Sequence, residues 1–279
     1  MRNKLIKVTR FFGSLLGERN ATVIIKFLHK ATDAPIMNIA LNHYGIFKGT
    51  DMKNSGEEFA ILRIFKPYLD EHDVILDIGA NTGDYAKYLV KHIHANRIIS
   101  IEPNPLTFDL LVKNVNHECY NYAISEKEGQ QPFYVSHENP ISALASFSSH
   151  TIPENETPKE ILVEGISLKN LINQLKIDSL GLLKVDTEGY DYQVLKSGAS
   201  HLKDIKFIQF EFNEFHVFTR TFIRDFHELL SPSHDMFRLD TDRLHDLTHY
   251  DPRMEIFRFQ NIIAIRKDLK HLISEYIKA

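Results

Sequence analysis

Short apolar runs alternate with helix-type patterns along most of the chain. The apolar runs predict strands at residues 74–76, 97–101, 118–125, 131–135, 161–163, 180–185, 205–210, 236–239 and 256–265. Apolar positions about one turn apart predict helices at residues 55–68, 85–93, 108–114, 168–175, 194–199, 222–230 and 269–277. Strands that alternate with helices and finish in two closing strands predict an α/β fold. We expect a Rossmann-like, doubly wound, mostly parallel sheet with an antiparallel edge.

The turn after the first strand has the residues of a nucleotide-binding turn. Asp77 ends the strand, Gly79 allows a close backbone approach, and Asn81 tolerates a left-handed conformation. The helix that begins at Gly83 offers free backbone amides. The pattern D-x-G-x-N-x-G differs from the G-x-G-x-x-G of dinucleotide-binding proteins. A carboxylate in this turn would repel a pyrophosphate, whereas it suits the ammonium and sulfonium groups of S-adenosylmethionine.

A second acid, Glu102, ends the next strand 25 residues after Asp77. This separation is near the ~20 residues at which a strand-end acid meets ribose hydroxyls. The alternative is an acid that only caps the next helix. The third strand, 118–125, is expected beside the second, where an adenine ring would stack. The predicted cofactor-binding residues are Asp77, Gly79, Ala80, Asn81, Gly83, Glu102, Pro103, Asn104 and Ala123.

Three further acids follow later strands. Asp186 and Glu188 come after strand 180–185, and Glu211 comes after strand 205–210. Ligands of open α/β sheets bind outside the carboxyl ends of the strands. A general base must accept a proton, and paired carboxylates raise one another's pKa toward that of a base. We therefore expect these three acids to be catalytic, with Glu188 facing the acceptor.

Two other interpretations of these acids stay open. One of them could form a structural ion pair with Lys184. Together with Asn213 they are also oxygen ligands that suit Mg²⁺ or Ca²⁺, but their spacing matches no dedicated ion loop. No metal site is therefore predicted, and Mg²⁺ dependence is the less favoured alternative. His216 is a further candidate base, or otherwise a surface histidine in an aromatic-rich turn.

The chain divides into an N-terminal helical extension, residues 1–54, and a Rossmann-like domain, residues 55–279. Residues 1–19 read as a basic amphipathic helix, which could attach weakly to a membrane surface; packing or homodimer formation is favoured. Ser55 and Glu58 have the spacing of a capping box. Residues 136–160, rich in Ser, Asn, Pro and Thr, are expected to close over the site on the substrate side. A mobile surface loop is the alternative.

Composition excludes several classes of protein. Lys and Arg number 33 against 37 Asp and Glu, a net charge of −4, so no basic field attracts nucleic acid. The single cysteine, Cys119, excludes an intramolecular disulfide and suits a reducing, cytoplasmic compartment. The 15 histidines lack the spacing of a zinc site. No apolar run approaches the ~18 residues of a membrane span.

Several stretches together resemble the FkbM family of S-adenosylmethionine-dependent methyltransferases. They are D-I-G-A-N-T-G, E-P-N-P-L-T-F, K-V-D-T-E-G-Y-D-Y-Q-V-L-K-S-G-A, E-F-N and F-R-F-Q-N-I-I-A-I, within residues 55–266. The most specific part is residues 184–199. The resemblance implies a class I methyltransferase type of fold and O-methylation of a hydroxyl on a glycan or small-molecule acceptor.

Two functions from other classes are the alternatives to methyl transfer. An NAD-dependent oxidoreductase would share the fold, but the missing G-x-G-x-x-G and the acid before Gly79 argue against it. A non-catalytic scaffold would not need the acids that end the strands, and all of them are intact.

Overall fold

The computed structural model describes residues 20, 22–27, 29–31, 35–95 and 97–278, in two units, 1–43 and 44–279. In the first unit, residues 22–27, 29–31 and helix α2 (Ile36–His43) are helical. The amphipathic helix predicted for residues 1–19 lies outside the described residues. Among the residues described, none of the helices combines the length and apolar character that a bilayer span requires.

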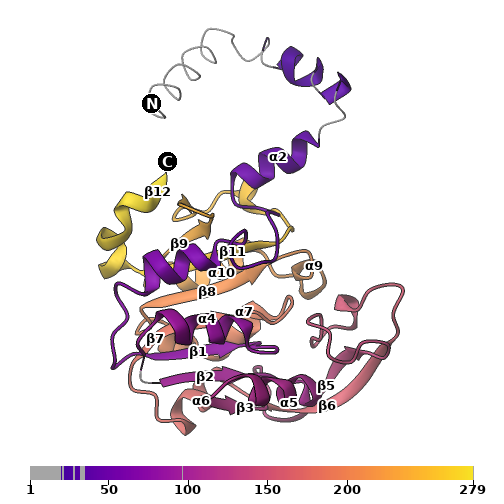
Figure 1. Ribbon diagram of the computed structural model, residues 1–279, viewed down its shortest axis with the longest axis vertical. Helices are drawn as coiled ribbons and strands as arrows, with labels where there is room; N and C mark the ends of the chain where they lie inside the picture. Colours follow the sequence, from indigo (N-terminus) through magenta and orange to yellow (C-terminus); the bar gives the residue numbers. More distant parts are fainter. Residues whose placement is uncertain (1–19, 21, 28, 32–34, 96, 279) are drawn as a thin grey trace. The chain divides into compact units, whose positions relative to one another are not determined.

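The second unit is built on a nine-stranded sheet with the order β12-β10-β9-β11-β8-β7-β1-β2-β3 (Figure 1). Its strands are β1 (Val74–Ile78), β2 (Arg97–Ile101), β3 (Glu118–Tyr120), β7 (Leu180–Val185), β8 (Phe207–Phe212), β9 (His234–Leu239), β10 (Leu244–Asp246), β11 (Gln260–Arg266) and β12 (Ile277–Lys278). Neighbours from β8 to β3 are parallel, whereas β11 is antiparallel to both β8 and β9. The predicted doubly wound sheet with an antiparallel edge is confirmed. Its edge also contains β10 and β12, which the sequence pattern did not predict.

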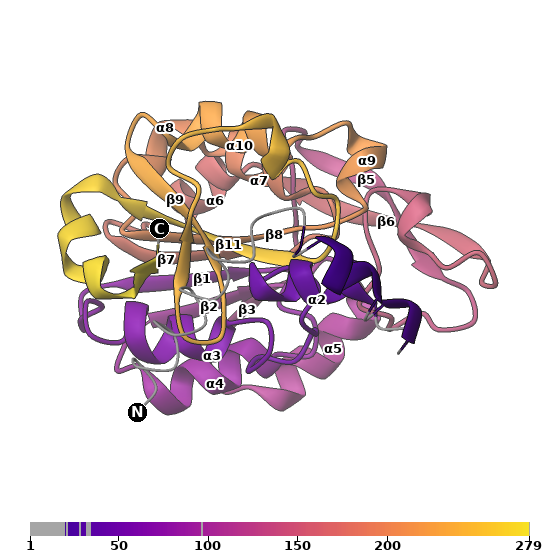
Figure 2. The ribbon, with the colours of Figure 1, turned by 90° about the horizontal axis from the view of Figure 1, so that it is seen from above.

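Helices cover both faces of this sheet (Figure 2). They are α3 (Glu57–Phe59), the π-helix η1 (Ala60–Phe65), α4 (Asp84–His92), α5 (Pro105–Asn114), α6 (Leu168–Gln174), α7 (Asp191–Ser197), α8 (Ala199–Leu202), α9 (His216–Thr219) and α10 (Ile223–Leu230). Within β1, Leu76 and Ile78 join the core under α6, α7 and α10, while Ile75 joins the core under η1 and α4. This alternation places apolar side chains on both faces, so the parallel strands are buried.

A second sheet of three strands, in the order β4-β6-β5, contains β4 (Ala123–Ile124), β5 (Gly129–Ser136) and β6 (Pro158–Ile166). The single strand predicted at 118–125 is therefore wrong, because β3 and β4 belong to different sheets. The break lies at Asn121, whose side-chain amide donates to the carbonyls of Glu102 (2.8 Å) and Pro103 (3.0 Å). At this point the chain leaves β3, at the edge of the nine-stranded sheet, and enters the smaller sheet.

Two helix predictions also need correction. The capping box of Ser55 and Glu58 is absent: Gly56, at φ 87°, takes the N-cap position, and the Ser55 hydroxyl bonds to Glu57 instead. The terminal α-helix predicted at 269–277 is a 3₁₀ helix, η4 (Lys267–Tyr276). The hydroxyl of Tyr68, which lies outside η4, donates to the carbonyl of Leu272 in η4 at 2.9 Å. In an α-helix, this carbonyl would accept the backbone amide of residue 276. Shorter 3₁₀ turns are η2 (Ser149–Thr151) and η3 (Pro252–Met254).

Candidate active site

The turn after β1 is held in a conformation that its glycines permit. Gly79, Asn81 and Gly83 have φ angles of 79°, 48° and 91°. A Cβ on Gly79 would overlap the backbone carbonyl of Asp186, so the turns after β1 and β7 touch there. The amides of Gly79 and Ala80 both donate to the carbonyl of Ile101, at 2.9 and 3.0 Å. The carboxyl ends of β1, β2 and β7 are thereby joined into one rim.

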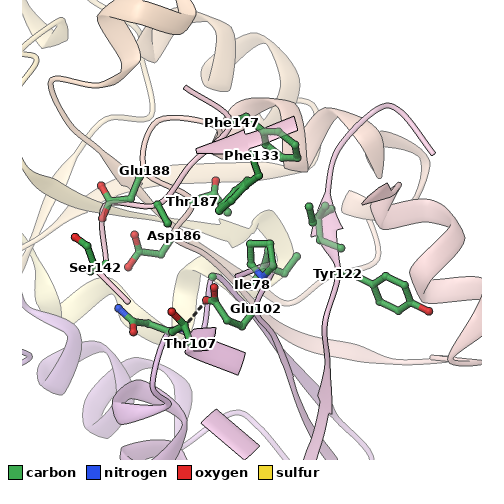
Figure 3. Close-up of a pocket in the computed structure, with 17 residues that line it drawn as sticks. Ile78, Glu102, Thr107, Tyr122, Phe133, Ser142, Phe147, Asp186, Thr187 and Glu188 are labelled. Carbon is green, nitrogen blue, oxygen red and sulfur yellow. Dashed lines mark hydrogen bonds between the residues drawn. The ribbon is translucent and has the colours of Figure 1, made fainter. Parts of the chain in front are cut away.

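Glu102 links two of these turns. Its two carboxylate oxygens accept the backbone amides of Asn81 (3.0 Å) and Asn104 (2.9 Å), and the side chain is 6% exposed (Figure 3). Burial raises its pKa to about 7, although the two amides oppose that change. Asn104, not Glu102, caps α5, since its side-chain oxygen accepts the amide of Leu106. The alternative of Glu102 as the cap of this helix is therefore wrong.

Asp77 is the acid without a partner. Its side chain is fully buried, and neither carboxylate oxygen has a hydrogen-bond partner among the described residues. Burial raises its pKa to about 6; Lys184 opposes this change and Asp186 adds to it. A buried carboxylate in this state favours a cationic ligand group, which would supply the missing partner.

Lys184 forms the ion pair that the sequence left as an alternative. Its ammonium lies 2.9 Å from the Asp186 carboxylate and 4.8 Å from the centre of the Tyr85 ring. Burial lowers the pKa of Lys184, but the charges of Asp186 and of other nearby acids hold it well above the ordinary lysine value. The pair orients Asp186 and does not remove it from the site, because its side chain is still 31% exposed and Asp186 lines the cavities described below.

A buried polar network that the sequence analysis missed lies behind this lysine. The Tyr85 hydroxyl donates to Gln209 at 2.9 Å, and the Gln209 amide donates to Glu57 at 3.0 Å. Burial raises the pKa of Glu57, which Lys184 opposes. The signal for this network was a glutamine inside the apolar strand β8, a position where an unpaired amide would be costly.

Three neighbouring hollows surround the rim. The apolar hollow, about 90 Å³, is lined by residues that include Tyr122, Ala123, Phe133 and Phe147. The turn hollow, about 240 Å³, is lined by Asp77, Gly79, Lys184 and others. The wide hollow, about 550 Å³, is lined by acids, asparagines and three phenylalanines. Asp186 lines all three, so the hollows meet at this residue.

The apolar hollow also contains two unpaired hydroxyls. Thr107 and Thr187 line it, and neither Oγ1 atom has a partner among the described residues. Both belong to segments that follow strand ends, α5 and the turn after β7. Buried polar groups are normally paired, so these hydroxyls indicate a ligand with its own donors or acceptors. Nothing in their sequence positions singled them out.

The long connection between β5 and β6 lies against the site. Its Ser142, Ala143, Ala145 and Phe147 line the apolar hollow. The Asn104 side chain donates to the Pro140 carbonyl at 2.6 Å, and the Ser146 hydroxyl donates to the Glu188 carbonyl at 3.1 Å. Residues 137–157 therefore form one wall of the site. Whether they close over a ligand stays a prediction.

Glu188 and Glu211 share one hydrogen-bond donor, the side-chain amide of Asn213. Glu188 and Gly189 both have left-handed backbones, at φ 52° and 88°, a conformation that costs free energy at a non-glycine residue. The Asn213 amide donates to Glu211 at 2.5 Å and to Glu188 at 3.4 Å. Burial, followed by the charge of Asp186, raises the pKa of both glutamates well above the ordinary value. In Figure 3 the side chains of Asp186 and Glu188 lie on the same side of the site.

The structure brings most of the predicted site residues together. Gly79, Asn81, Glu102, Pro103, Ala123, Asp186 and Glu188 line the apolar hollow, Asp77 and Ala80 line the turn hollow, and Glu211 lines the wide hollow. Gly83 and Asn104 line none of them; they cap α4 and α5. A Cβ on Gly83 would lie 2.7 Å from Val115, so this glycine serves helix packing.

His216 is neither a rim base nor a surface residue, so both sequence interpretations are wrong. It is fully buried and stacks on Phe212, with 4.7 Å between the ring centres. Burial lowers its pKa to about 3. Its Nε2 atom lies 3.6 Å from Asp191, a buried acid whose pKa burial raises to about 8. Among the described residues, no three His, Cys, Asp or Glu side chains are placed to hold a metal ion.

Comparisons with known proteins find similarity to methyltransferases. Among curated proteins, the chain is similar to the hexuronic acid methyltransferase AglP of Haloferax volcanii, 27% identical over 153 residues. That match covers 53% of this chain and 59% of AglP, so the chain spans about three-fifths of its relative.

Solved structures give weaker likenesses. Methyltransferase FkbM from Methylobacillus flagellatus KT has a TM-score of 0.42 at 14% identity, covering 82% of this chain and 59% of that one. TrmK of M. capricolum, in complex with S-adenosylhomocysteine, has a TM-score of 0.40 at 10% identity, covering 78% and 69%.

A family model described as the methyltransferase FkbM domain matches residues 77–238. The match begins at the acid of the β1 turn and includes Glu102, Asp186, Glu188 and Glu211. It covers more than half of the chain, and the chain therefore belongs to the FkbM methyltransferase domain family.

Proposed function

We propose that the protein transfers the methyl group of S-adenosylmethionine to a hydroxyl group of its acceptor. The observation that carries this proposal is the position of Asp186, where the three hollows converge. Adenosine would occupy the apolar hollow and the methionine end the turn hollow, so the sulfonium would lie near Asp186. The acceptor would approach the same carboxylate from the wide hollow.

The residues of the rim fit this cofactor. Asp77 offers an unpaired buried carboxylate to the ammonium group, and Glu102 keeps lone pairs for ribose hydroxyls beside the two amides it already accepts. Thr107 and Thr187 offer unpaired hydroxyls next to the aromatic residues that would flank adenine. Buried carboxylates at this rim disfavour the pyrophosphate of NAD.

We assign the proton transfer to Glu188. The bound cofactor supplies an electrophilic methyl group with a neutral leaving thioether, so the protein's tasks are alignment and proton removal. Burial raises the pKa of Glu188 toward the range in which a carboxylate is an effective general base. Asp186, held by Lys184, would orient the acceptor hydroxyl, and Glu211 would support the pair through Asn213.

The acceptor that these observations favour is a glycan hydroxyl. AglP is described as a hexuronic acid methyltransferase, and this likeness supports a sugar as the acceptor. A metal-free mechanism stays the prediction; the ion pair between Lys184 and Asp186 gives this carboxylate a cationic partner within the chain. A cytoplasmic location, the lack of nucleic-acid partners, and a homodimer or a weak membrane contact through residues 1–19 stay predictions.

The function is tested with S-adenosylmethionine labelled in its methyl group. The protein is incubated with a mixture of neutral glycosides, with and without EDTA. We expect label in the sugar as an alkali-stable methyl ether and equal amounts of S-adenosylhomocysteine, unchanged by the chelator. Transfer that is lost with EDTA and restored by Mg²⁺ would contradict the metal-free mechanism. NAD reduction without methyl transfer would contradict the proposed function.

Glu102→Ala should weaken S-adenosylmethionine binding by about 1–2 kcal/mol, because the charge-assisted bonds to the ribose are lost and the two amides lose their acceptor. Calorimetry measures the change. Glu154→Ala is the matched control, since this exposed glutamate on the β5–β6 connection lines none of the hollows. Equal affinities of the Glu102→Ala and control variants would remove the ribose assignment.

Turnover should increase with pH, and the midpoint of this increase should lie above the pKa of an ordinary glutamate. A general base works only when deprotonated, and burial holds the pKa of Glu188 above its ordinary value of 4.5. The pH profile of kcat/KM measures this, with cofactor affinity determined at each pH. A profile that is flat from acid to neutral pH would contradict the base assignment.

A further inference from the structure

The wide hollow, which the proposed function assigns to the acceptor, has the size and walls of a sugar site. Its volume of about 550 Å³ falls in the range of small-molecule pockets, and Phe47, Phe215 and Phe259 line it. Phe47 is 43% exposed, and its backbone amide donates to the Phe259 carbonyl at 2.8 Å. These rings offer flat apolar faces, which suit the C–H face of a pyranose. One face of Phe47 is covered by the Arg258 guanidinium, 5.0 Å from the ring centre, and Arg258 does not itself line the hollow.

Two polar side chains on adjacent strands line the same hollow. Asn261 on β11 lies directly opposite Glu211 on β8, and both side chains contribute to the hollow. Asn261 is 4% exposed and lines the hollow, and its side-chain amide takes part in none of the hydrogen bonds found among the described residues. Glu211 is 8% exposed, and one of its oxygens accepts the amide of Asn213. A buried amide that opens into a cavity without a partner indicates a ligand that supplies one.

The charge of the hollow selects against anions. Its lining contains the acids Glu57, Asp186, Glu188, Glu211 and Glu214, and no basic side chain among the described residues. The nearby Lys184 is already paired with Asp186. Burial and the charge of Asp186 already raise the pKa of Glu188 and Glu211, so this hollow disfavours negative charge. A sugar carboxylate would meet the same cost, because the described lining contains no cation to receive it.

From this arrangement we infer that the acceptor site takes a neutral, polyhydroxylated sugar ring and rejects a uronic acid. The Asn261 amide donates to one ring hydroxyl, and the Glu211 carboxyl accepts from a neighbouring one. The phenylalanines hold the apolar face of the ring. The inference rests on the proposed function and narrows it, because it separates this chain from AglP, which is described as acting on hexuronic acid.

The test compares three probes by calorimetry: methyl α-glucopyranoside, methyl α-glucuronide and methyl α-glucosaminide, each titrated into the S-adenosylhomocysteine-loaded protein. We expect the neutral glucoside to bind at least about tenfold more tightly than the glucuronide, because the hollow disfavours negative charge. A glucuronide that binds equally or more tightly overturns the inference. So does tighter binding of the amino sugar, which would indicate a cation site. Binding of none of the probes also overturns it.

Two variants test which residues bind the sugar and exclude the glucuronide. Asn261→Ala should weaken glucoside binding roughly 5- to 10-fold through the lost hydrogen bond. Its affinity for S-adenosylhomocysteine should not change, because Asn261 lines neither of the other hollows. Glu211→Gln should reduce the ratio between the affinities for the glucoside and the glucuronide. If Asn261→Ala binds the glucoside as the wild type does, the recognition pair is wrong.

Cofactor binding keeps the two proposals separable. A wild-type protein that does not bind S-adenosylhomocysteine contradicts the proposed function. The sugar titrations are therefore repeated without the nucleoside, and these affinities still decide between a neutral and an anionic ring.

Discussion

Glu188→Gln should lower kcat by about 10²–10⁴-fold and leave the affinity for S-adenosylmethionine unchanged. The amide keeps the shape of the side chain and its neighbour Asn213, but it cannot accept a proton. Glu188 lines both the apolar and the wide hollow, where the transferred methyl group and the acceptor hydroxyl would meet. The loss should therefore fall on the chemical step and not on cofactor binding.

This result is measured as release of S-adenosylhomocysteine with a neutral glycoside as acceptor, and calorimetry follows cofactor affinity. Glu154→Gln is the matched control, since this exposed glutamate lines none of the three hollows. Wild-type turnover in both Glu188→Gln and Asp186→Asn would contradict the base assignment. Glu211 would then be the remaining titratable candidate at the rim, because His216 is buried in the core.

Asp77→Asn should weaken S-adenosylmethionine binding about 10- to 100-fold, because a buried carboxylate that would pair with the ammonium group is neutralised. The same change should stabilise the ligand-free protein by about 1–2 kcal/mol near neutral pH. Both effects come from one cause. The carboxylate of Asp77 is buried without a hydrogen-bond partner among the described residues, so its charge costs stability until a ligand pairs with it.

The pH dependence of stability tests whether the Asp77 carboxylate destabilises the folded protein. The pKa of Asp77 is about 6 in the folded protein and 3.8 ordinarily, so the folded state binds the proton more tightly than the unfolded state. The resulting stabilisation is complete below the ordinary value and is lost as pH rises through about 6. Denaturant unfolding near pH 4 and near pH 7.5 should therefore separate the variant from wild type only at the higher pH. A variant that is less stable near neutral pH, or that binds the cofactor normally, would contradict the role of Asp77.

The strands around the nucleotide turn were predictable because their signals are local. An apolar run followed by Asp77 and Gly79 indicates a buried strand and a tight turn without knowledge of the rest of the chain. The convergence of Asp77, Glu102 and Asp186 was predictable as well, since parallel strands end at one edge of a sheet. The structure confirms both features.

The errors arise where distant contacts outweigh local pattern. Asn121 ends β3 because its side chain bonds to the chain after β2, a contact that no local pattern reports. Gly56 replaced the expected cap at Ser55 because its left-handed backbone redirects the chain. His216 lies in the core because Phe212 and the surrounding aromatic residues pack around it.

The acceptor side of the site was the least predictable from the sequence. Asn261 and Glu211 are 50 residues apart, and they meet only through the antiparallel pairing of β11 with β8. The sequence pattern predicted both strands but not their register. The position of residues 137–157 depends on side-chain bonds to backbone carbonyls, which have no periodic signature.

The most direct test of the central claim is calorimetric titration of the purified protein with S-adenosylmethionine, S-adenosylhomocysteine and NAD. The hollows that converge on Asp186 predict one binding site per chain for the first two ligands and no binding of NAD. Binding of NAD, or the absence of binding by S-adenosylmethionine and S-adenosylhomocysteine, would contradict it.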